Sequence, residues 1–168
     1  MITIFTDGSS KGNPGPGGWG AIIADEKMVK EIGGREKHTT NNKMELTACI
    51  RALESLEANS QKQEAITIYS DATYVVKGIT EWIHGWHRNN WKTAGKKPVE
   101  NKDLWMQLFE ATQGKNLHWK LVAGHAGIPA NERCDIIATS FADAEPTKLY
   151  NSSRSAYKIS LESNGSFS

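Results

Sequence analysis

The sequence has few cysteines, no long apolar run and almost no net charge, and each shortage excludes a class of protein. Only two cysteines, Cys49 and Cys134, stand far apart among the 168 residues, so the sequence predicts neither a zinc site nor a disulfide framework. No apolar stretch reaches the roughly 18 residues of a membrane-spanning helix, and Met1–Asp7 lacks the segments of a secretion signal. We therefore expect a cytoplasmic protein with reduced thiols and no membrane association.

Positive charge is concentrated in one segment of an otherwise balanced chain. The chain has 20 Lys and Arg against 19 Asp and Glu, a net charge of +1. Between Trp82 and Lys102, five basic residues oppose the single acid Glu100, a local charge of +4 that leaves −3 for the remainder. Such a distribution is typical of a protein with one surface that meets a polyanion and another that collects cations. Charge alone leaves open that the segment is a solvated loop.

Apolar periodicity predicts an α/β fold built on one mixed, five-stranded sheet. The expected strands are residues 2–6, 19–24, 29–36, 65–70 and 117–122, and helical spacing occurs within 46–56, 72–86, 104–109 and 134–142. The first three strands are expected to form an antiparallel meander. The helical crossovers that follow make the later strands parallel to the first and place helices on both faces.

The length fits a single domain, which we expect over residues 1–145, followed by a tail over 146–168. Seven of the final 22 residues are serine, which predicts a mobile tail. The alternation of Tyr157, Ile159 and Leu161 leaves open a short docked strand within it.

Two predicted strands end in the same local pattern, with an acid between a β-hydroxy residue and a small residue. These segments are Thr6–Gly8 and Ser70–Ala72. If the two strands are parallel neighbours, Asp7 and Asp71 emerge side by side at one edge of the sheet, where the repulsion between them favours a bound cation. The alternative is structural, with Asp7 starting a turn and Asp71 capping the following helix.

Two further acids lie near predicted helix starts. Glu45 follows Asn42, the predicted helix cap, by three residues, so a capping box is an alternative to a ligand role. Asp135 is expected in the first turn of the last helix, where the helix dipole favours an acid. If the four carboxylates converge, their oxygen ligands suit Mg²⁺ or Mn²⁺ rather than zinc.

A histidine follows the last predicted strand. His125 lies between Gly124 and Gly127 in a pliable loop. Beside a metal centre it could transfer protons or help the product leave. The alternative is an exposed loop histidine with no role in catalysis.

Aromatic residues accompany the basic segment. Trp82, Trp86 and Trp91 lie in it, and Trp105 follows closely. Aromatic residues among lysines indicate nucleic-acid binding, by stacking on bases or sugars with charge on the phosphates. Packing between helices fits the spacing equally well and is the preferred interpretation for Trp82, whereas Lys92, Lys96 and Lys97 are harder to explain as core residues.

Taken together, these motifs resemble the type 1 ribonuclease H family, in its bacterial form with a basic protrusion, over about residues 1–145. The resemblance rests on several motifs in the family order: Thr6–Ser9 with Gly12–Gly18, Thr39–Leu46, Ser70–Asp71, Trp91–Thr93, Gly124–Gly127 and Asn131–Asp135. It implies a ribonuclease H-like fold and an endonuclease that hydrolyses the RNA strand of RNA–DNA hybrids.

The resemblance also implies roles for the acidic residues. Asp7, Glu45, Asp71 and Asp135 would hold two Mg²⁺ ions, for which Mn²⁺ would substitute, and His125 would assist turnover. Asp7 would contact both ions, Asp135 the ion that activates water, and Glu45 and Asp71 the ion that stabilises the leaving 3′-oxygen. A scheme with one ion and His125 as the base stays open. The products would carry 5′-phosphate and 3′-hydroxyl ends.

Substrate-binding roles follow from the same resemblance, and a monomer acting on a hybrid is expected. The residues placed to read RNA 2′-hydroxyls are Ser10, Asn13, Asn41, Asn42 and Thr73. Thr40 and Asn101 would hold a DNA-strand phosphate, and the remaining contacts to the DNA strand would come from Trp82, Trp86, Lys92, Lys96 and Lys97. Two other classes of protein stay open. One is a hybrid-binding module without catalysis, in which the acids only cap helices or start turns, and the other is a DNA-cutting nuclease on the same fold.

Overall fold

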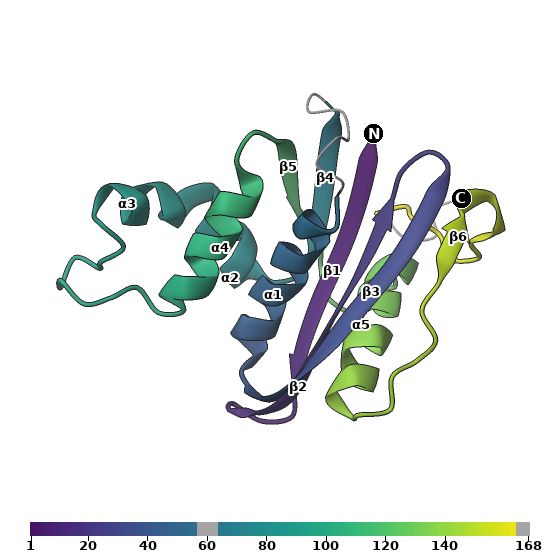
Figure 1. The fold of residues 1–168 in the computed structure, drawn as a ribbon, viewed down its shortest axis with the longest axis horizontal. Coiled ribbons are helices and arrows are strands. Elements are labelled where there is room, and N and C mark those ends of the chain that lie inside the picture. Colours follow the sequence, from purple (N-terminus) through teal and green to yellow (C-terminus); the bar gives the residue numbers. More distant parts are fainter. Residues whose placement is uncertain (57–63, 164–168) are drawn as a thin grey trace.

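The computed structural model describes residues 1–56 and 64–163, which form a mixed sheet with helices on both faces (Figure 1). The strands lie in the order β5-β4-β1-β2-β3-β6. Their bounds are β1 Ile2–Ser10, β2 Gly15–Ala24, β3 Met28–Thr39, β4 Ala65–Ser70, β5 Asn116–Leu121 and β6 Asn151–Ser153. The helices are α1 Asn41–Glu54, α2 Thr73–Lys77, a π-helical turn Gly78–Trp82, α3 Ile83–Arg88, α4 Lys102–Thr112, α5 Pro129–Ala142 and a 3₁₀ turn Arg154–Ala156.

The predicted topology is confirmed, with β1, β2 and β3 antiparallel and β4 and β5 parallel to β1. The first hairpin is longer than predicted, because Gly17–Gly20 of the glycine-rich stretch pairs as a strand with Asp7–Ser10. These glycines also let α5 pack closely on β2, since a Cβ on Gly18 would lie 2.1 Å from the carbonyl oxygen of Ala138. The glycines that predicted a turn therefore serve partly to allow close packing of a helix on the sheet.

Alternate residues of the strands supply two separate cores, one on each face of the sheet. On one face, Ile4 and Ala21 pack with Leu46 and Ile50 of α1 and with Trp105 of α4. The other face carries a core under α5, made of Phe5, Ile22, Ala24, Val29, Ile128, Ala130 and Cys134. The strand ends that lie between α1 and α5 are therefore held from both sides.

The sheet has six strands and not the predicted five, because part of the tail pairs with it. Asn151–Ser153 forms β6 against the β3 edge, with Val29 opposite Ser152. The tail is thus docked through residue 161, which corrects the expectation of a mobile tail over the described residues. Residues 157–161 form no strand, although Tyr157, Ile159 and Leu161 do pack against the core under α5.

The helical region after β4 is interrupted, whereas the periodicity predicted one continuous helix. A π-helical turn separates α2 from α3.

Within the described residues, no helix combines the length and apolarity needed to cross a bilayer.

Candidate active site

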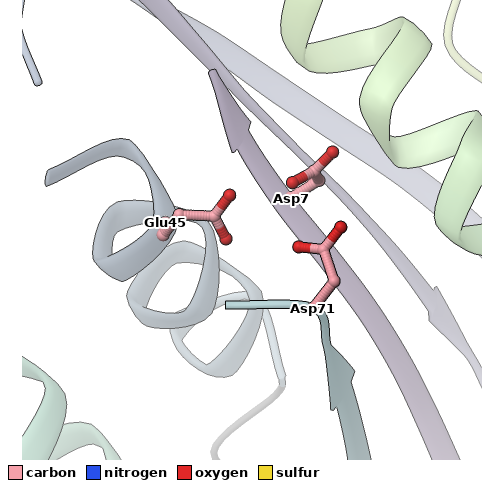
Figure 2. Close-up of side chains that lie close together, drawn as sticks. All are labelled: Asp7, Glu45 and Asp71. Carbon is pink, nitrogen blue, oxygen red and sulfur yellow. The ribbon is translucent and has the colours of Figure 1, made fainter. Parts of the chain in front are cut away.

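Asp7 and Asp71 lie side by side at the edge of the sheet, as the repeated strand-end pattern predicted (Figure 2). The parallel register of β1 and β4 pairs Phe5 with Tyr69, so the two acids occupy equivalent positions two residues further along. Asp71 belongs to the turn after β4, where the Ser70 hydroxyl accepts a hydrogen bond from the Ala72 N–H at 3.0 Å. The β-hydroxy residue therefore shapes the turn that presents the carboxylate.

Glu45 reaches the same place from α1, and the prediction that Asn42 caps this helix is wrong, as is the alternative capping-box role of Glu45. The helix is capped by Thr40, whose hydroxyl accepts from the Lys43 N–H at 3.2 Å, so Asn42 lies inside the helix and forms no capping box with Glu45. Instead, Glu45 Oε1 accepts from the Gly8 N–H at 2.9 Å. Glu45 Oε2 is buried and has no hydrogen-bond partner among the described residues.

The three carboxylates form a compact, electrostatically costly group. Asp7, Glu45 and Asp71 each offer an oxygen within 4.8 Å of the others, and Asp7 and Glu45 are only 6% and 3% exposed. Burial raises the pKa of Asp7 to about 7, and the charges of Asp71 and Asp135 act in the same direction. Burial, followed by the charge of Asp7, raises the pKa of Glu45 well above its usual range.

These features fit a divalent cation. A cation would neutralise the repulsion between the carboxylates and would bind the Glu45 oxygen that has no hydrogen-bond partner among the described residues. An all-oxygen donor set suits Mg²⁺ or Mn²⁺. The group therefore has the chemistry of a metal site.

Asp135 borders the same cleft but stands apart from the compact group. The cleft has a volume of about 410 Å³ and is lined by all four predicted acids. Because α5 begins at Pro129, Asp135 is its seventh residue and does not lie in the first turn as predicted, where Glu132 is found instead. The helix dipole therefore does not account for Asp135, since its effect is confined to the first turn.

The His125 loop also borders the cleft. His125 has a left-handed backbone, with φ of 58°, a conformation that non-glycine residues adopt uncommonly. The loop passes directly over Asp71, because a Cβ on Gly124 would lie 3.0 Å from Asp71 Oδ2. The glycine before His125 thus permits a close approach to an acid of the site.

The chain is similar to known proteins over most of its length. The RNase H family model matches residues 1–143. A ribonuclease H of Bradyrhizobium sp. (strain ORS 278) is 54% identical over 138 residues, which cover 82% of this chain and 87% of the relative. This chain belongs to the ribonuclease H family. It is therefore a hydrolase of the endoribonuclease class.

Solved structures agree with the assignment to the ribonuclease H family. LC9-RNase H1, a type 1 RNase H with the type 2 active-site motif, matches with a TM-score of 0.77 and 28% identity, over 90% of this chain and 77% of that one. LC11-RNase H1, solved in complex with an RNA/DNA hybrid, matches with a TM-score of 0.66 and 25% identity, over 86% of this chain and 98% of that one. The predicted ribonuclease H-like fold is confirmed.

The residues that the ribonuclease H resemblance assigned to 2′-hydroxyls fall into two groups. Asn41, Asn42 and Thr73 line the cleft beside the acids. Ser10 and Asn13 lie next to it, because Asn13 Oδ1 accepts from the Ser10 hydroxyl and from the Asn41 N–H, both at 3.0 Å. The glycine-rich hairpin is thereby tied to the start of α1, directly after the capping residue Thr40.

The basic segment projects from the sheet as α3 and the loop that follows it (Figure 1). Trp82 is 40% exposed, and its ring lies 6.2 Å from Tyr74 and 5.9 Å from Trp86. Lys92, Lys96 and Lys97 are exposed in the loop. The aromatic residues therefore both pack and present surface, and the lysines extend that surface with positive charge.

Sequence reasoning missed two polar residues of the cleft. Asn131 is 4% exposed, and its Nδ2 lies 3.5 Å from Asp71 Oδ2. Asn131 precedes Asp135 by four residues on one helix, a spacing that places both on the same face, and this spacing could have identified it from the sequence. Tyr74 accepts hydrogen bonds from Asn101 Nδ2 at 3.2 Å and Trp105 Nε1 at 2.9 Å, which links the basic segment to the cleft.

The raised pKa of Asp7 predicts a pH-dependent loss of stability in the metal-free protein. The folded pKa of about 7 exceeds the usual 3.8, so the contribution of Asp7 to stability is fully present below about pH 4 and is lost as the pH rises through 7. Asp7→Asn removes this penalty and should stabilise the protein by on the order of a few kcal/mol near pH 8, but not near pH 4. Urea denaturation in EDTA measures the difference, with the exposed Glu36→Gln as control. Equal effects of Asp7→Asn at both pH values would contradict the raised pKa.

Proposed function

We propose that this ribonuclease H cleaves the RNA strand of RNA–DNA hybrids with two divalent ions, Mg²⁺ in the cell and Mn²⁺ as a substitute. The observation that carries the proposal is the group of three carboxylates within 4.8 Å, with one buried oxygen that has no partner among the described residues. We assign Asp7, Glu45, Asp71 and Asp135 as the ligands. When bound, such ions stabilise negative charge on the attacking and leaving oxygens of a phosphodiester.

The residues around the acids prepare the reaction. Asp7 and Glu45 are fixed in position by the Gly8 N–H, which donates to both side chains at 2.9 Å. We assign His125, on its loop over Asp71, to proton transfer between the reacting oxygens and solvent. Attack of water on phosphorus with departure of the 3′-oxygen leaves a 5′-phosphate and a 3′-hydroxyl.

Selectivity for RNA requires side chains that contact 2′-hydroxyls, since these distinguish RNA from DNA locally. The position of Asn41, Asn42 and Thr73 in the cleft supports this role, and the hydrogen bonds of Ser10 and Asn13 to that region support theirs.

Contacts to the DNA strand are assigned to a second set of residues. Thr40 and Asn101 would hold a phosphate, and the basic segment would provide the remaining contacts, from Trp82, Trp86, Lys92, Lys96 and Lys97. The link from Asn101 through Tyr74 to the cleft supports this assignment.

We further propose that the protein acts in the cytoplasm as a monomer. Both cysteines are buried and unpaired, as expected of a protein in a reducing compartment.

The deciding experiment is cleavage of a hybrid whose RNA strand carries a 5′ label, with Mg²⁺ and then with EDTA. Cleavage of the RNA strand only with Mg²⁺ is expected, because the site needs the cation. Intact RNA under both conditions would favour a hybrid-binding module. Parallel reactions with duplex DNA and duplex RNA separate the remaining alternative, since cleavage of duplex DNA would indicate a different nuclease on this fold.

A further inference from the structure

The C-terminal tail covers the core under α5, next to the helix that carries Asp135. The tail leaves α5 and runs back along the β3 edge, where Glu31 N–H donates to the Tyr150 carbonyl at 2.7 Å and Arg154 N–H to the Lys27 carbonyl at 2.8 Å. Beyond β6, Tyr157, Ile159 and Leu161 add to the core under α5. The tail residues that make these contacts lie outside residues 1–143, which the family model matches.

Glu31 is the point at which the tail, the sheet and α5 meet. Its side chain, 1% exposed, projects from β3 on the same face as Val29. It accepts from Arg133 Nε at 2.8 Å and Nη2 at 2.9 Å, from the Tyr150 N–H at 2.8 Å and from the Tyr157 hydroxyl at 2.7 Å. Burial alone would raise the pKa of Glu31, but these hydrogen bonds outweigh it and lower the pKa.

The tail supplies half of these four hydrogen bonds and also holds the other member of the ion pair. Arg133 Nη2 donates to the carbonyl of Lys148 at 2.9 Å. Without the tail, a buried carboxylate would lose two donors and its guanidinium would lose an acceptor. A buried ion pair is favourable only when such additional hydrogen bonds are present.

Arg133 connects this network to the active site through the geometry of α5. It lies two residues before Asp135, and two residues of an α-helix are separated by roughly 200° around the axis. Arg133 therefore points to β3 while Asp135 and Asn131 border the cleft. The bidentate contact at Arg133 adds a restraint on the rotation of α5 to the close packing of this helix on β2, and the position of Asp135 in the cleft depends on that rotation.

We propose that the tail is a positioning element for Asp135, with Tyr157 as its main residue, acting through Glu31 and Arg133. The inference rests on the proposed role of Asp135 in binding a divalent ion. Residues 146–161 then belong to the catalytic folding unit, although they follow residues 1–143, which the family model matches.

The test compares two tail variants that each lose one phenolic hydroxyl. Tyr157→Phe removes a donor to Glu31, whereas Tyr150→Phe removes only the hydrogen bond from the Tyr150 hydroxyl to the Ser153 carbonyl, within the tail. Binding of Mn²⁺ is measured by titration calorimetry without substrate, together with the Mg²⁺ concentration for half-maximal cleavage. Mutation of a residue that hydrogen-bonds to a metal ligand lowers metal affinity about 10-fold or more. Tyr157 is more distant from the ligands, so for Tyr157→Phe we expect about threefold weaker Mn²⁺ binding, with KM for the hybrid unchanged. Tyr150→Phe should bind like the wild type.

Two outcomes overturn the proposal: Mn²⁺ binding unaltered by Tyr157→Phe, or weakened equally by both variants. The variant Asp135→Asn and the double variant with Tyr157→Phe show whether the effect passes through Asp135. If it does, Tyr157→Phe causes no further loss in the Asp135→Asn background. Wild-type binding by Asp135→Asn alone would instead contradict the proposed ligand role of Asp135, which separates the two failures.

Discussion

Replacing Asp7 with asparagine is expected to lower hybrid cleavage on the order of 10³-fold while the fold stays intact. Metal stabilisation of a transition state is worth several kcal/mol, and about 1.4 kcal/mol corresponds to a factor of ten in rate. Asparagine has the same shape and can still accept from the Gly8 N–H, which Asp7 Oδ1 does at 2.9 Å. It lacks the negative charge that a divalent cation requires. The measurement is single-turnover cleavage of labelled hybrid in Mg²⁺.

The control for this substitution is Asp103→Asn, which makes the same chemical change on α4, outside the residues that line the cleft. It should cleave like the wild type. Because Asp7→Asn should also stabilise the metal-free protein, unfolding cannot explain a loss of activity. Wild-type cleavage by Asp7→Asn would remove Asp7 from the metal site.

The strand-end acids were predictable because their geometry follows from backbone rules alone. A shared pattern on two parallel strands places Asp7 and Asp71 together, and the observed register does so. Glu45 was harder, since Thr40 and Asn42 are both good capping residues and the spacing of Asn42 to Glu45 imitates a capping box. The burial of Glu45 against β1, which local sequence does not encode, decides its role.

The tail shows a second limit of sequence reasoning. Its serine content indicated mobility, yet its apolar and aromatic residues dock on a core whose outline depends on where α5 leaves the sheet uncovered. Similarly, Glu31 appears in the sequence as one more strand acid. Only the tertiary structure shows that Arg133, more than a hundred residues away, makes it a buried ion pair.

Replacing Gly8 with alanine is expected to damage both stability and cleavage, because β1 and α1 touch at this residue. A Cβ at Gly8 would lie 2.4 Å from the Glu45 nitrogen and 2.4 Å from the Met44 carbonyl carbon, which are backbone atoms that no side-chain rotation can move away. Overpacking of this kind costs about 1–3 kcal/mol, and we expect the free energy of unfolding to fall by about 2 kcal/mol or more. Thermal or urea denaturation measures this fall.

The effect of Gly8→Ala on cleavage should exceed what the lost stability explains. To make room, α1 must move away from β1, and that movement separates Glu45 from Asp7 and weakens the hydrogen bonds that the Gly8 N–H donates to both. A misplacement of about 1 Å can cost about 100-fold in rate, so cleavage by the folded variant should fall by at least about tenfold.

Gly85→Ala is the matched control, because a Cβ there meets nothing within 4 Å. Since Gly85 lies within α3, that change should leave cleavage unaltered and stabilise the helix by about 0.5–1 kcal/mol. Wild-type cleavage by Gly8→Ala would show that the spacing of β1 and α1 does not set the positions of the carboxylates.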